Sequence, residues 1–290
     1  MIPPAEIAIS EQLVKQLVAE QFPEFAHLKV RFLDTGWDNE SYKIGDRFIA
    51  RIPRRQLAVE LLHNEIRWLP QLETQLPIRI PAPLGIGQPT DYYPWPWTIV
   101  PWFAGRAADE ATVQNAAALP LATFLRALHR PAPADIPTND YRGVPLEIRA
   151  ADVFRRLDLL ANRKDLITDQ IRQLWQNALE EPFPAGAQLL HGDLHPRNII
   201  VHNGLVGAII DWGDLTGGDV ATDLAVFWML FRDKPTREKA LTAYGADQSL
   251  KNRAIGWAIF FGTIFLESGA GGDKRHADIG ASILQNIATE

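Results

Sequence analysis

The amino-acid sequence predicts an α+β fold with two lobes, in which a small antiparallel β-sheet lobe precedes a larger, mainly α-helical lobe. Runs of residues that favour strands gather between residues 28 and 100, whereas helical periodicity dominates after residue 105. Prolines recur throughout residues 77–101, too closely for a helix to form, and they mark the boundary. We therefore expect an N-terminal lobe over 1–100, a hinge over 101–105 and a C-terminal lobe over 106–290.

Length, composition and charge limit the classes of protein that fit. The chain has 290 residues, of which 47% are apolar and 22% are charged, as in soluble globular proteins that bury a substantial core. It has no cysteine, which excludes disulfides, thiolate catalysis and cysteine metal sites. A formal net charge of −6 argues against a nucleic-acid partner and mildly favours cationic ligands.

The sequence contains no pattern typical of membrane insertion or export. The first residues lack the basic start and apolar core of a signal peptide. The longest apolar run, 254–266, is shorter than the roughly 20 residues that a membrane span needs. We expect a cytoplasmic protein with no membrane contact, present as a monomer or dimer.

The elements of the N-terminal lobe follow from periodicity and from start and stop signals. A helix over 9–22 has Ser10 as its N-cap and Pro23 as its stop. A second helix, over 57–72, carries an apolar stripe. Strands are expected at 28–33, 40–44, 47–52 and 97–100.

The C-terminal lobe is expected to be helical around one strand pair. Residues 199–201 and 205–210 are strand-forming runs joined by His202-Asn203-Gly204, and Asn-Gly strongly indicates a hairpin turn. Residues 217–219 are expected to form a turn, and Asp223 to open a helix. The other helices are expected at 119–129, 153–179, 236–244, 250–267 and 276–288.

Two carboxylates and one carboxamide stand beside this hairpin. Asp193 follows His191-Gly192, Asn198 comes after a gap of four residues, and Asp211 follows the second strand. In a protein-kinase catalytic loop, an Asp and an Asn in this spacing orient the substrate hydroxyl and hold Mg²⁺, and a later Asp also binds the metal. Each acid alone could be an ordinary turn or cap residue. Their order, with a hairpin between them, favours a phosphoryl-transfer centre.

His191-Gly192-Asp193 with Asn198, followed by Ile210-Asp211-Trp212-Gly213-Asp214, resembles the aminoglycoside phosphotransferase family. The resemblance implies a bilobal protein-kinase-like fold, with Asp193 as catalytic base, Asn198 and Asp211 as Mg²⁺ ligands, and His191 bracing the loop. It also implies transfer of the γ-phosphoryl group of ATP or GTP to a hydroxyl of an aminoglycoside-type antibiotic. His195 matches a histidine common in that loop and receives no role.

Residues that would hold the nucleotide lie in the first lobe and the hinge. Gly36 lies in the turn expected to cover the phosphates, because glycine lets the backbone approach them closely. Arg51 occupies the strand position of the phosphate-binding lysine of kinases, and Glu65 is its expected partner, with Glu60 as a competitor. Val100 and Trp102 belong to the segment whose backbone would read the purine.

Simpler interpretations of these residues remain open. Gly36 also suits a plain strand turn, and Arg51 a surface position. In that case the phosphate would be met by one of three other cations: Lys43, Arg54 or Arg55.

Other functions stay open as well. The acceptor could be a macrolide or a metabolic alcohol resembling choline or homoserine, since one fold hosts many acceptors. The chain could also be a nucleotide-binding protein with little transferase activity, or a metal-dependent hydrolase using His191, Asp193 and His195.

Glu267, Asp273 and Asp278 are candidates to attract the ammonium groups of an aminoglycoside. Asp219 and Asp223 are expected to be structural acids that steady the catalytic loop, and His129 a helix cap.

Overall fold

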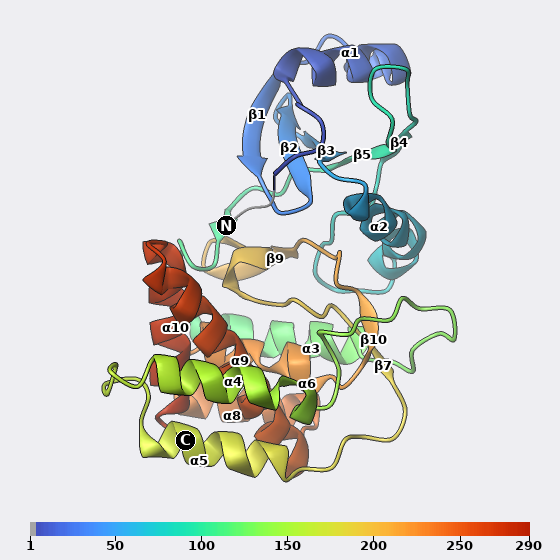
Figure 1. The fold of residues 1–290 in the computed structure, drawn as a ribbon. Coiled ribbons are helices and arrows are strands. Elements are labelled where there is room, and N and C mark those ends of the chain that lie inside the picture. The colour runs from blue at the N-terminus through green and yellow to red at the C-terminus, as the bar shows by residue number, and fades with distance from the viewer. Residues whose placement is uncertain (1–3) are drawn as a thin grey trace. The chain divides into compact units, whose positions relative to one another are not determined.

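The computed structural model describes residues 4–290, which divide into two compact units. The first unit runs to residue 75 and includes 79–104, and the second comprises 76–78 and 105–290. The boundary between the two units lies between residues 104 and 105, inside the segment expected to be the hinge. Residues 76–78, expected in the N-terminal lobe, belong to the second unit. The predicted α+β class is confirmed, because the first unit contains an antiparallel sheet and the second is mainly helical (Figure 1).

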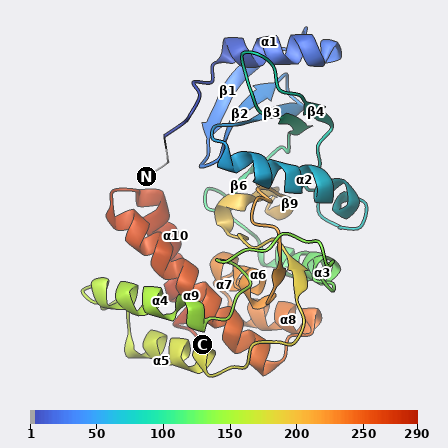
Figure 2. The same cartoon turned by 45° about the vertical axis from the view of Figure 1, so that its right-hand side comes forward.

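A five-stranded antiparallel sheet in the order β1-β2-β3-β5-β4 forms the first unit. Helices α1 and α2 flank this sheet (Figure 2). The elements are α1 (Glu11–Gln21), β1 (Val30–Thr35), β2 (Asn39–Ile44), β3 (Phe48–Pro53), α2 (Leu57–Glu73), β4 (Gly85–Gly87) and β5 (Trp97–Pro101).

Local signals explain where these elements begin and end. The Ser10 hydroxyl caps α1 by accepting from the Leu13 amide at 3.2 Å, as the sequence predicts. One face of α1, with Val14 and Leu17, packs into a core that also contains the buried Trp97. Alternate residues of β2 and β3 enter the same core, so the hydrophobic pattern sets the register of the strands.

The second unit consists of helices around two small sheets, in the orders β6-β8-β9 and β10-β7. Its helices are α3 (Ala118–Leu128), α4 (Glu147–Leu159), α5 (Asp169–Leu179), α6 (Ala221–Leu224), α7 (Val226–Leu230), α8 (Lys234–Tyr244), α9 (Gln248–Ala270) and α10 (Lys274–Ile287). Its strands are β6 (Arg106–Ala107), β7 (Gln188–Leu190), β8 (Ile199–His202), β9 (Leu205–Ile209) and β10 (Thr216–Gly218). The long helix α9 is buried along most of its length and is the centre of this unit. None of the helices within residues 4–290 has both the length and the apolar character to cross a bilayer.

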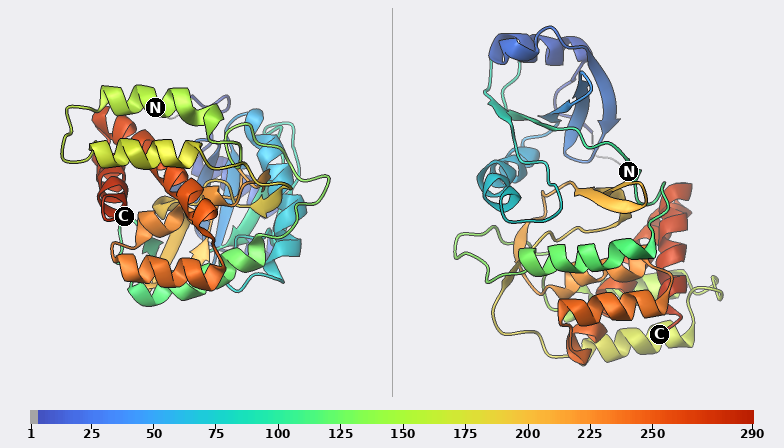
Figure 3. Two further views of the ribbon diagram at one scale, coloured as in Figure 1. Left: turned by 90° about the horizontal axis from the view of Figure 1, so that it is seen from below. Right: turned by 180° about the vertical axis from the view of Figure 1, so that it is seen from behind.

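One predicted helix is wrong, because residues 153–179 form two helices instead of one. Helix α4 ends at Leu159, and α5 starts after Thr168, whose hydroxyl accepts from the Ile171 amide at 3.3 Å. The chain reverses between them, and α4 and α5 lie side by side against α9 (Figures 1 and 3). Both helices are amphipathic, so periodicity alone could not reveal the break.

The turn predicted at residues 217–219 is also wrong, since Thr216–Gly218 is the strand β10, paired antiparallel with β7. The reason is tertiary packing. A Cβ atom on Gly218 would lie 2.4 Å from the carbonyl oxygen of Gly143, so the glycine permits a loop to press against the strand.

Candidate active site

The loop from His191 to Asp193 follows β7, and the buried carboxylate of Asp223 holds it through hydrogen bonds. Asp223 accepts hydrogen bonds from the amides of His191 at 2.7 Å and Gly192 at 2.9 Å. Its Oδ2 atom also lies 3.1 Å from Nε2 of His129. Asp223 is therefore a structural acid that fixes the course of the loop, as we expected from the sequence, and His129 takes part in the same network.

Gly192 makes the tight course of this loop possible. Its φ is +87°, in the left-handed region that favours glycine. A Cβ atom at this position would meet the carbonyl oxygen of Asp214 at 2.4 Å. No other residue type fits here without moving the backbone.

His191 links the loop to the end of the hairpin. Its Nδ1 accepts from the amide of Asp193 at 3.2 Å, and its Nε2 lies 3.1 Å from the carbonyl oxygen of Ile210. An acceptor at Nδ1 and a carbonyl at Nε2 require the neutral ring with its proton on Nε2. Because both nitrogens are engaged and the side chain is buried, His191 braces the loop and has no lone pair left for a metal.

Asp193 lies at the tip of the loop with a cationic neighbour on one oxygen and a histidine on the other. The Arg142 guanidinium is 2.8 Å from Oδ1, and Nε2 of His195 is 3.2 Å from Oδ2. Burial would raise the pKa of the Asp193 carboxyl, but the charges and hydrogen bonds of His195 and Arg142 outweigh it and hold the pKa well below its usual range. The carboxylate is therefore ionised at neutral pH.

Asn198 and Asp211 stand at the two ends of the predicted hairpin, which the structure contains as β8 and β9. The amide of Ile210 donates to the carbonyl of Asn198 at 2.9 Å, so the residues that precede and follow the hairpin are neighbours. The turn itself has positive φ at Asn203 and Gly204, the conformation that an Asn-Gly turn adopts.

The donor chemistry of this pair fits Mg²⁺. The Asn198 amide nitrogen donates to the carbonyl oxygen of Asp193 at 2.9 Å, which directs its own side-chain oxygen away as a potential ligand. Asp211 has a φ of 64°, an uncommon value outside glycine that is found at functional sites. One carboxylate and one amide oxygen suit Mg²⁺, which takes its remaining ligands from phosphates and water.

A second acid, Asp214, lies behind the loop. Asn139 donates to its Oδ1 at 2.6 Å. Burial and the negative charge of Asp193 raise the pKa of Asp214, against the opposing effects of Arg142 and Asn139. The two acids therefore differ in character, since Asp193 is ionised while Asp214 resists ionisation.

Arg142 is the residue near Asp193 that the sequence did not reveal. It belongs to an irregular loop before α4 and is 51 positions from Asp193 along the chain. No periodicity or motif marks it. The only local signal is the Asn139-Asp140 pair, because Asn and Asp are typical of turns. In the structure, the Asn139 side chain accepts hydrogen bonds from the amides of Tyr141 at 2.8 Å and Arg142 at 3.1 Å.

In the first unit, Arg51 on β3 forms an ion pair with Glu65 on α2. Both side chains are largely shielded from solvent, and Glu65 keeps one buried oxygen without a hydrogen-bond partner among the described residues. Glu60, the competing acid, is exposed. The structure therefore brings together the two residues that the sequence selected, and their role at the phosphates stays a prediction.

The other nucleotide-site candidates have local partners. The Gly36 amide donates to the Asn39 carbonyl at 2.9 Å, and Arg54 donates to the Gly36 carbonyl at 3.1 Å. Arg55 pairs with Asp38. In this conformation the Gly36 amide is used inside its own turn, so its contact with phosphate also stays a prediction.

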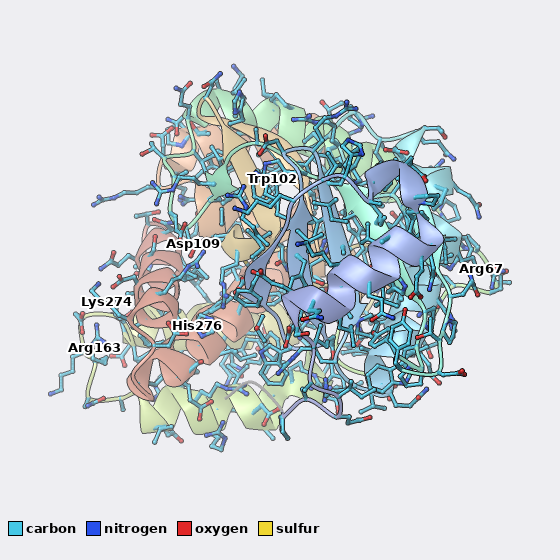
Figure 4. The ribbon with its side chains drawn as sticks, turned by 90° about the horizontal axis from the view of Figure 1, so that it is seen from above. Arg67, Trp102, Asp109, Arg163, Lys274 and His276 are labelled. Carbon is cyan, nitrogen blue, oxygen red and sulfur yellow. The ribbon has the colours of Figure 1, made fainter. Side chains whose placement is uncertain are left out.

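The expected hinge residues continue the sheet. Val100 is buried in β5 and pairs with Ile49. The amide of Trp102, labelled in Figure 4, donates to the Arg47 carbonyl at 2.7 Å, and Lys43 lies over its ring at 4.5 Å. Recognition of a purine by the backbone of this segment stays a prediction.

The three acids considered for ammonium binding all have partners. Glu267 pairs with Arg155 at 2.7 Å and Arg156 at 2.8 Å. Asp273 caps α10 by accepting from the amide of His276, and Asp278 pairs with Lys274; His276 and Lys274 are both labelled on α10 in Figure 4. Asp219 bonds Arg253 at 2.7 Å and the Ala221 amide at 3.1 Å, in keeping with a structural role.

Comparison with known proteins gives the family. The model described as Phosphotransferase enzyme family matches residues 29–258 of this chain. The protein YcbJ of Bacillus subtilis strain 168 is 30% identical over 98 residues, so the match spans only 31% of this chain and 32% of that protein.

Solved structures resemble the whole chain. Aminoglycoside 2′-phosphotransferase-IIIa in its GDP complex has a TM-score of 0.67 at 19% identity, over 97% of this chain and 99% of that one. Macrolide 2′-phosphotransferase MphH from Brachybacterium faecium has a TM-score of 0.60 at 19% identity, over 94% and 97%. At such identity the likeness concerns the fold, whereas the family model covers most of the sequence. The chain therefore belongs to the phosphotransferase enzyme family.

Proposed function

We propose that this protein transfers the γ-phosphoryl group of ATP or GTP to a hydroxyl group of a small molecule, with Mg²⁺ as cofactor. One observation carries the proposal. An ionised Asp193 stands on a loop fixed by Asp223 and His191, and its neighbours Asn198 and Asp211 lie at the two ends of one hairpin. A phosphotransferase needs this combination of oriented carboxylate and oxygen ligands.

Asp193 orients the acceptor hydroxyl and takes its proton as the oxygen–phosphorus bond forms. Because its pKa is held low, it is a weak base. A weak base suffices, since the transition state of phosphoryl transfer is loose and the hydroxyl proton leaves late. The larger contribution of the residue is positional, because a correctly held hydroxyl makes the reaction effectively intramolecular.

Asn198 and Asp211 would hold Mg²⁺, which when bound neutralises charge on the phosphates. The Arg51–Glu65 pair would hold the α- and β-phosphates, Gly36 would lie over the phosphates, and the backbone at Val100 and Trp102 would bind the base. An enzyme that consumes ATP or GTP is expected in the cytoplasm. These assignments rest on the resemblance together with the local contacts described above.

The hydrolase alternative loses support from the contacts of His191. A metal-dependent hydrolase would use His191, Asp193 and His195 as ligands, but both ring nitrogens of His191 already have partners within the loop. The acceptor is a separate question. The resemblance favours an aminoglycoside-type antibiotic, and a macrolide or a metabolic alcohol remains the alternative.

The test is a mass-spectrometric search for phosphorylated products across aminoglycosides, macrolides, amino alcohols and hydroxy acids, run separately with ATP and GTP. For the best acceptor, Asp193→Asn should lower kcat by about 10²- to 10⁴-fold, because the amide neither orients the hydroxyl as the carboxylate does nor accepts its proton. Asp158→Asn is the matched control, since Asp158 lies on α4 with 75% of its side chain exposed.

Two results would count against the proposal. Near wild-type turnover by Asp193→Asn would remove Asp193 from its role. Nucleotide binding that requires Mg²⁺, with no phosphorylated product from any acceptor, would instead indicate a nucleotide-binding protein without transferase activity.

A further inference from the structure

Arg142 places a guanidinium directly on the carboxylate that receives the acceptor hydroxyl. Its Nη2 atom donates to Oδ1 of Asp193 at 2.8 Å. The guanidinium therefore lies beside the carboxylate that the acceptor hydroxyl would approach. The charge and geometry of this arginine bear on the class of molecule that binds.

The backbone on both sides of Arg142 is anchored, so its position is built into the fold. On one side, Asn139 accepts from the Arg142 amide at 3.1 Å and donates to Asp214. On the other, the Gly143 amide donates to Thr222 at 3.1 Å, and the Gly143 carbonyl accepts from the Asp219 amide at 2.9 Å. The loop is thus tied to the segment that carries Asp214 and to the residues next to Asp223.

Two aromatic rings lie next to the Arg142 guanidinium. Its Cζ atom lies 5.1 Å from the ring centre of Phe261 and 5.8 Å from that of Phe260, and both rings are buried in α9. Arginine stacks on aromatic faces in this way and keeps its in-plane donors for hydrogen bonds.

Arg142 has more donors than Asp193 uses. A guanidinium carries five N–H groups, and its Nε is buried with no hydrogen-bond partner within residues 4–290. Buried donors are nearly always satisfied, by protein, water or ligand. The unused Nε therefore points to a missing acceptor atom at this place.

A second arginine next to Phe260 also has a buried donor that makes no hydrogen bond within the described residues. Arg156, on α4, lies 5.8 Å from the centre of Phe260, donates through Nε to Glu267, and has a buried Nη1 with no partner in the described part of the chain. Arg142 pairs with Asp193, whereas Arg156 shares Glu267 with Arg155.

From these observations we infer that the acceptor carries an oxyanion group, a carboxylate or a phosphate, which Arg142 binds next to the hydroxyl that Asp193 orients. Arg156, on α4, contributes its unused Nη1 donor next to Phe260. The inference rests on the proposed function and narrows its acceptor class. It disfavours a polycationic aminoglycoside, because an ammonium beside the reacting hydroxyl would be repelled by Arg142, and Glu267, Asp273 and Asp278 are already paired.

The kinetic test uses short alcohols that differ in one terminal group: 3-hydroxypropionate, 3-hydroxypropyl phosphate, 3-hydroxypropionamide and 3-amino-1-propanol, with kanamycin added. We expect kcat/KM for one of the two anions to exceed that of the amide by at least about 10-fold and that of the amine by about 100-fold. The carboxylate and the phosphate arms decide which oxyanion is preferred.

Variants separate binding of the anion from mere support of Asp193. Arg142→Met should reduce the ratio of kcat/KM between anion and amide to about one, mainly through KM of the anion, whereas Arg142→Lys should retain part of the ratio. A purely structural role would lower kcat for all acceptors alike. Arg163→Lys is the matched control, because Arg163 is exposed in the connection between α4 and α5 and is labelled in Figure 4.

A binding measurement keeps the inference testable without turnover. The ¹⁵N–¹H signal of the Arg142 Nε, identified by its loss in Arg142→Lys, should shift on titration with propionate or inorganic phosphate and stay unchanged with propylamine.

Phosphorylation of the amine or kanamycin at least as fast as of the anions would overturn the inference and leave the proposed function intact. A shifting Nε signal with no product from any alcohol would support the oxyanion site and reject the transferase, whereas an unchanged signal would reject the oxyanion site.

Discussion

At the scale of single residues, the candidate centre depends on positions that do no chemistry. Asp223 accepts the two amides of the loop, His191 ties the loop to the hairpin, and Gly192 adopts a φ that other residues avoid. A carboxylate needs such support because a small misplacement of a reacting group lowers the rate severely. The local backbone is therefore as specific to the site as Asp193 itself.

Gly192→Ala should disable the site through backbone geometry alone. Gly186 is the matched control, because its φ of +83° is similar but nothing lies within 4 Å of an added Cβ. Gly186→Ala should cost about 1 to 2 kcal/mol of unfolding free energy, the penalty for a positive φ. Gly192→Ala adds the clash with the Asp214 carbonyl and should cost about 4 kcal/mol or more.

Urea unfolding and kcat of both variants measure the difference. We expect Gly192→Ala to lower kcat by at least about 100-fold and Gly186→Ala to leave it within about twofold. Equal effects of the two substitutions would show that the contact with Asp214 is unimportant.

At the scale of elements, the hairpin of β8 and β9 sets the separation between Asn198 and Asp211. Its turn places Asn203 at φ 52° and Gly204 at φ 79°, which matches the right-handed twist of the strands. The register continues to the hydrogen bond between the Ile210 amide and the Asn198 carbonyl. A change in the turn should therefore alter the positions of Asn198 and Asp211, the proposed Mg²⁺ ligands.

Gly204→Val should weaken Mg²⁺ binding, because a β-branched residue opposes the positive φ and its side chain would press on Gln114. We expect a loss of about 2 kcal/mol of unfolding free energy and a severalfold rise in the Mg²⁺ concentration for half-maximal turnover. Asn203→Gly is the control within the same turn, since glycine suits that φ and should change stability by less than about 0.5 kcal/mol. A normal Mg²⁺ requirement in Gly204→Val would separate the turn from the metal site.

At the scale of the whole molecule, a buried ion pair joins the last residues to the helices of the second unit. Arg237, fully buried on α8, donates to the carbonyls of Phe231 and Arg232 and pairs with Glu290. Glu290 also accepts from the indole of Trp228 at 2.9 Å. Removing one partner of such a pair leaves a buried charge without compensation.

Glu290 should make stability depend on pH. Burial would raise its pKa, but hydrogen bonds from Arg237 and Trp228 and the charge of Arg237 lower it below the ordinary value of about 4.5. In the folded state the carboxylate therefore stays ionised at a pH where the unfolded chain already binds a proton. Its contribution is complete above about pH 4.5 and is lost as the pH falls through the folded pKa.

Glu290→Gln should lower the unfolding free energy by about 3 kcal/mol at neutral pH, and the difference from wild type should shrink in acid. Urea unfolding between about pH 3 and pH 8 measures both. A difference that stays constant with pH would show that the charge of Glu290 is not responsible. Glu238→Gln is a suitable control, because Glu238 is about two-fifths exposed beside Lys251.

Part of this organisation could be predicted from local patterns. Four of the five strands of the first unit, the hairpin with its Asn-Gly turn and the Ser10 cap all depend on neighbouring residues, and the sequence shows them directly. Strand β4 (Gly85–Gly87) was not predicted. The break between α4 and α5 could not be predicted, since both helices keep the same amphipathic period. Strand β10 was missed because its glycines suit a turn, and its pairing with β7 depends on residues far away in sequence.

The sequence by itself determined the α+β class, the phosphotransferase family and the spacing of Asp193, Asn198 and Asp211, because these depend on short-range periodicity and on a compact motif. Only the tertiary structure decided what surrounds the carboxylate. Asp223 reaches the loop from 32 positions away, and Arg142 from 51. Contacts over such separations leave no local pattern. His195 of the same loop and the distant Arg142 together hold Asp193 ionised.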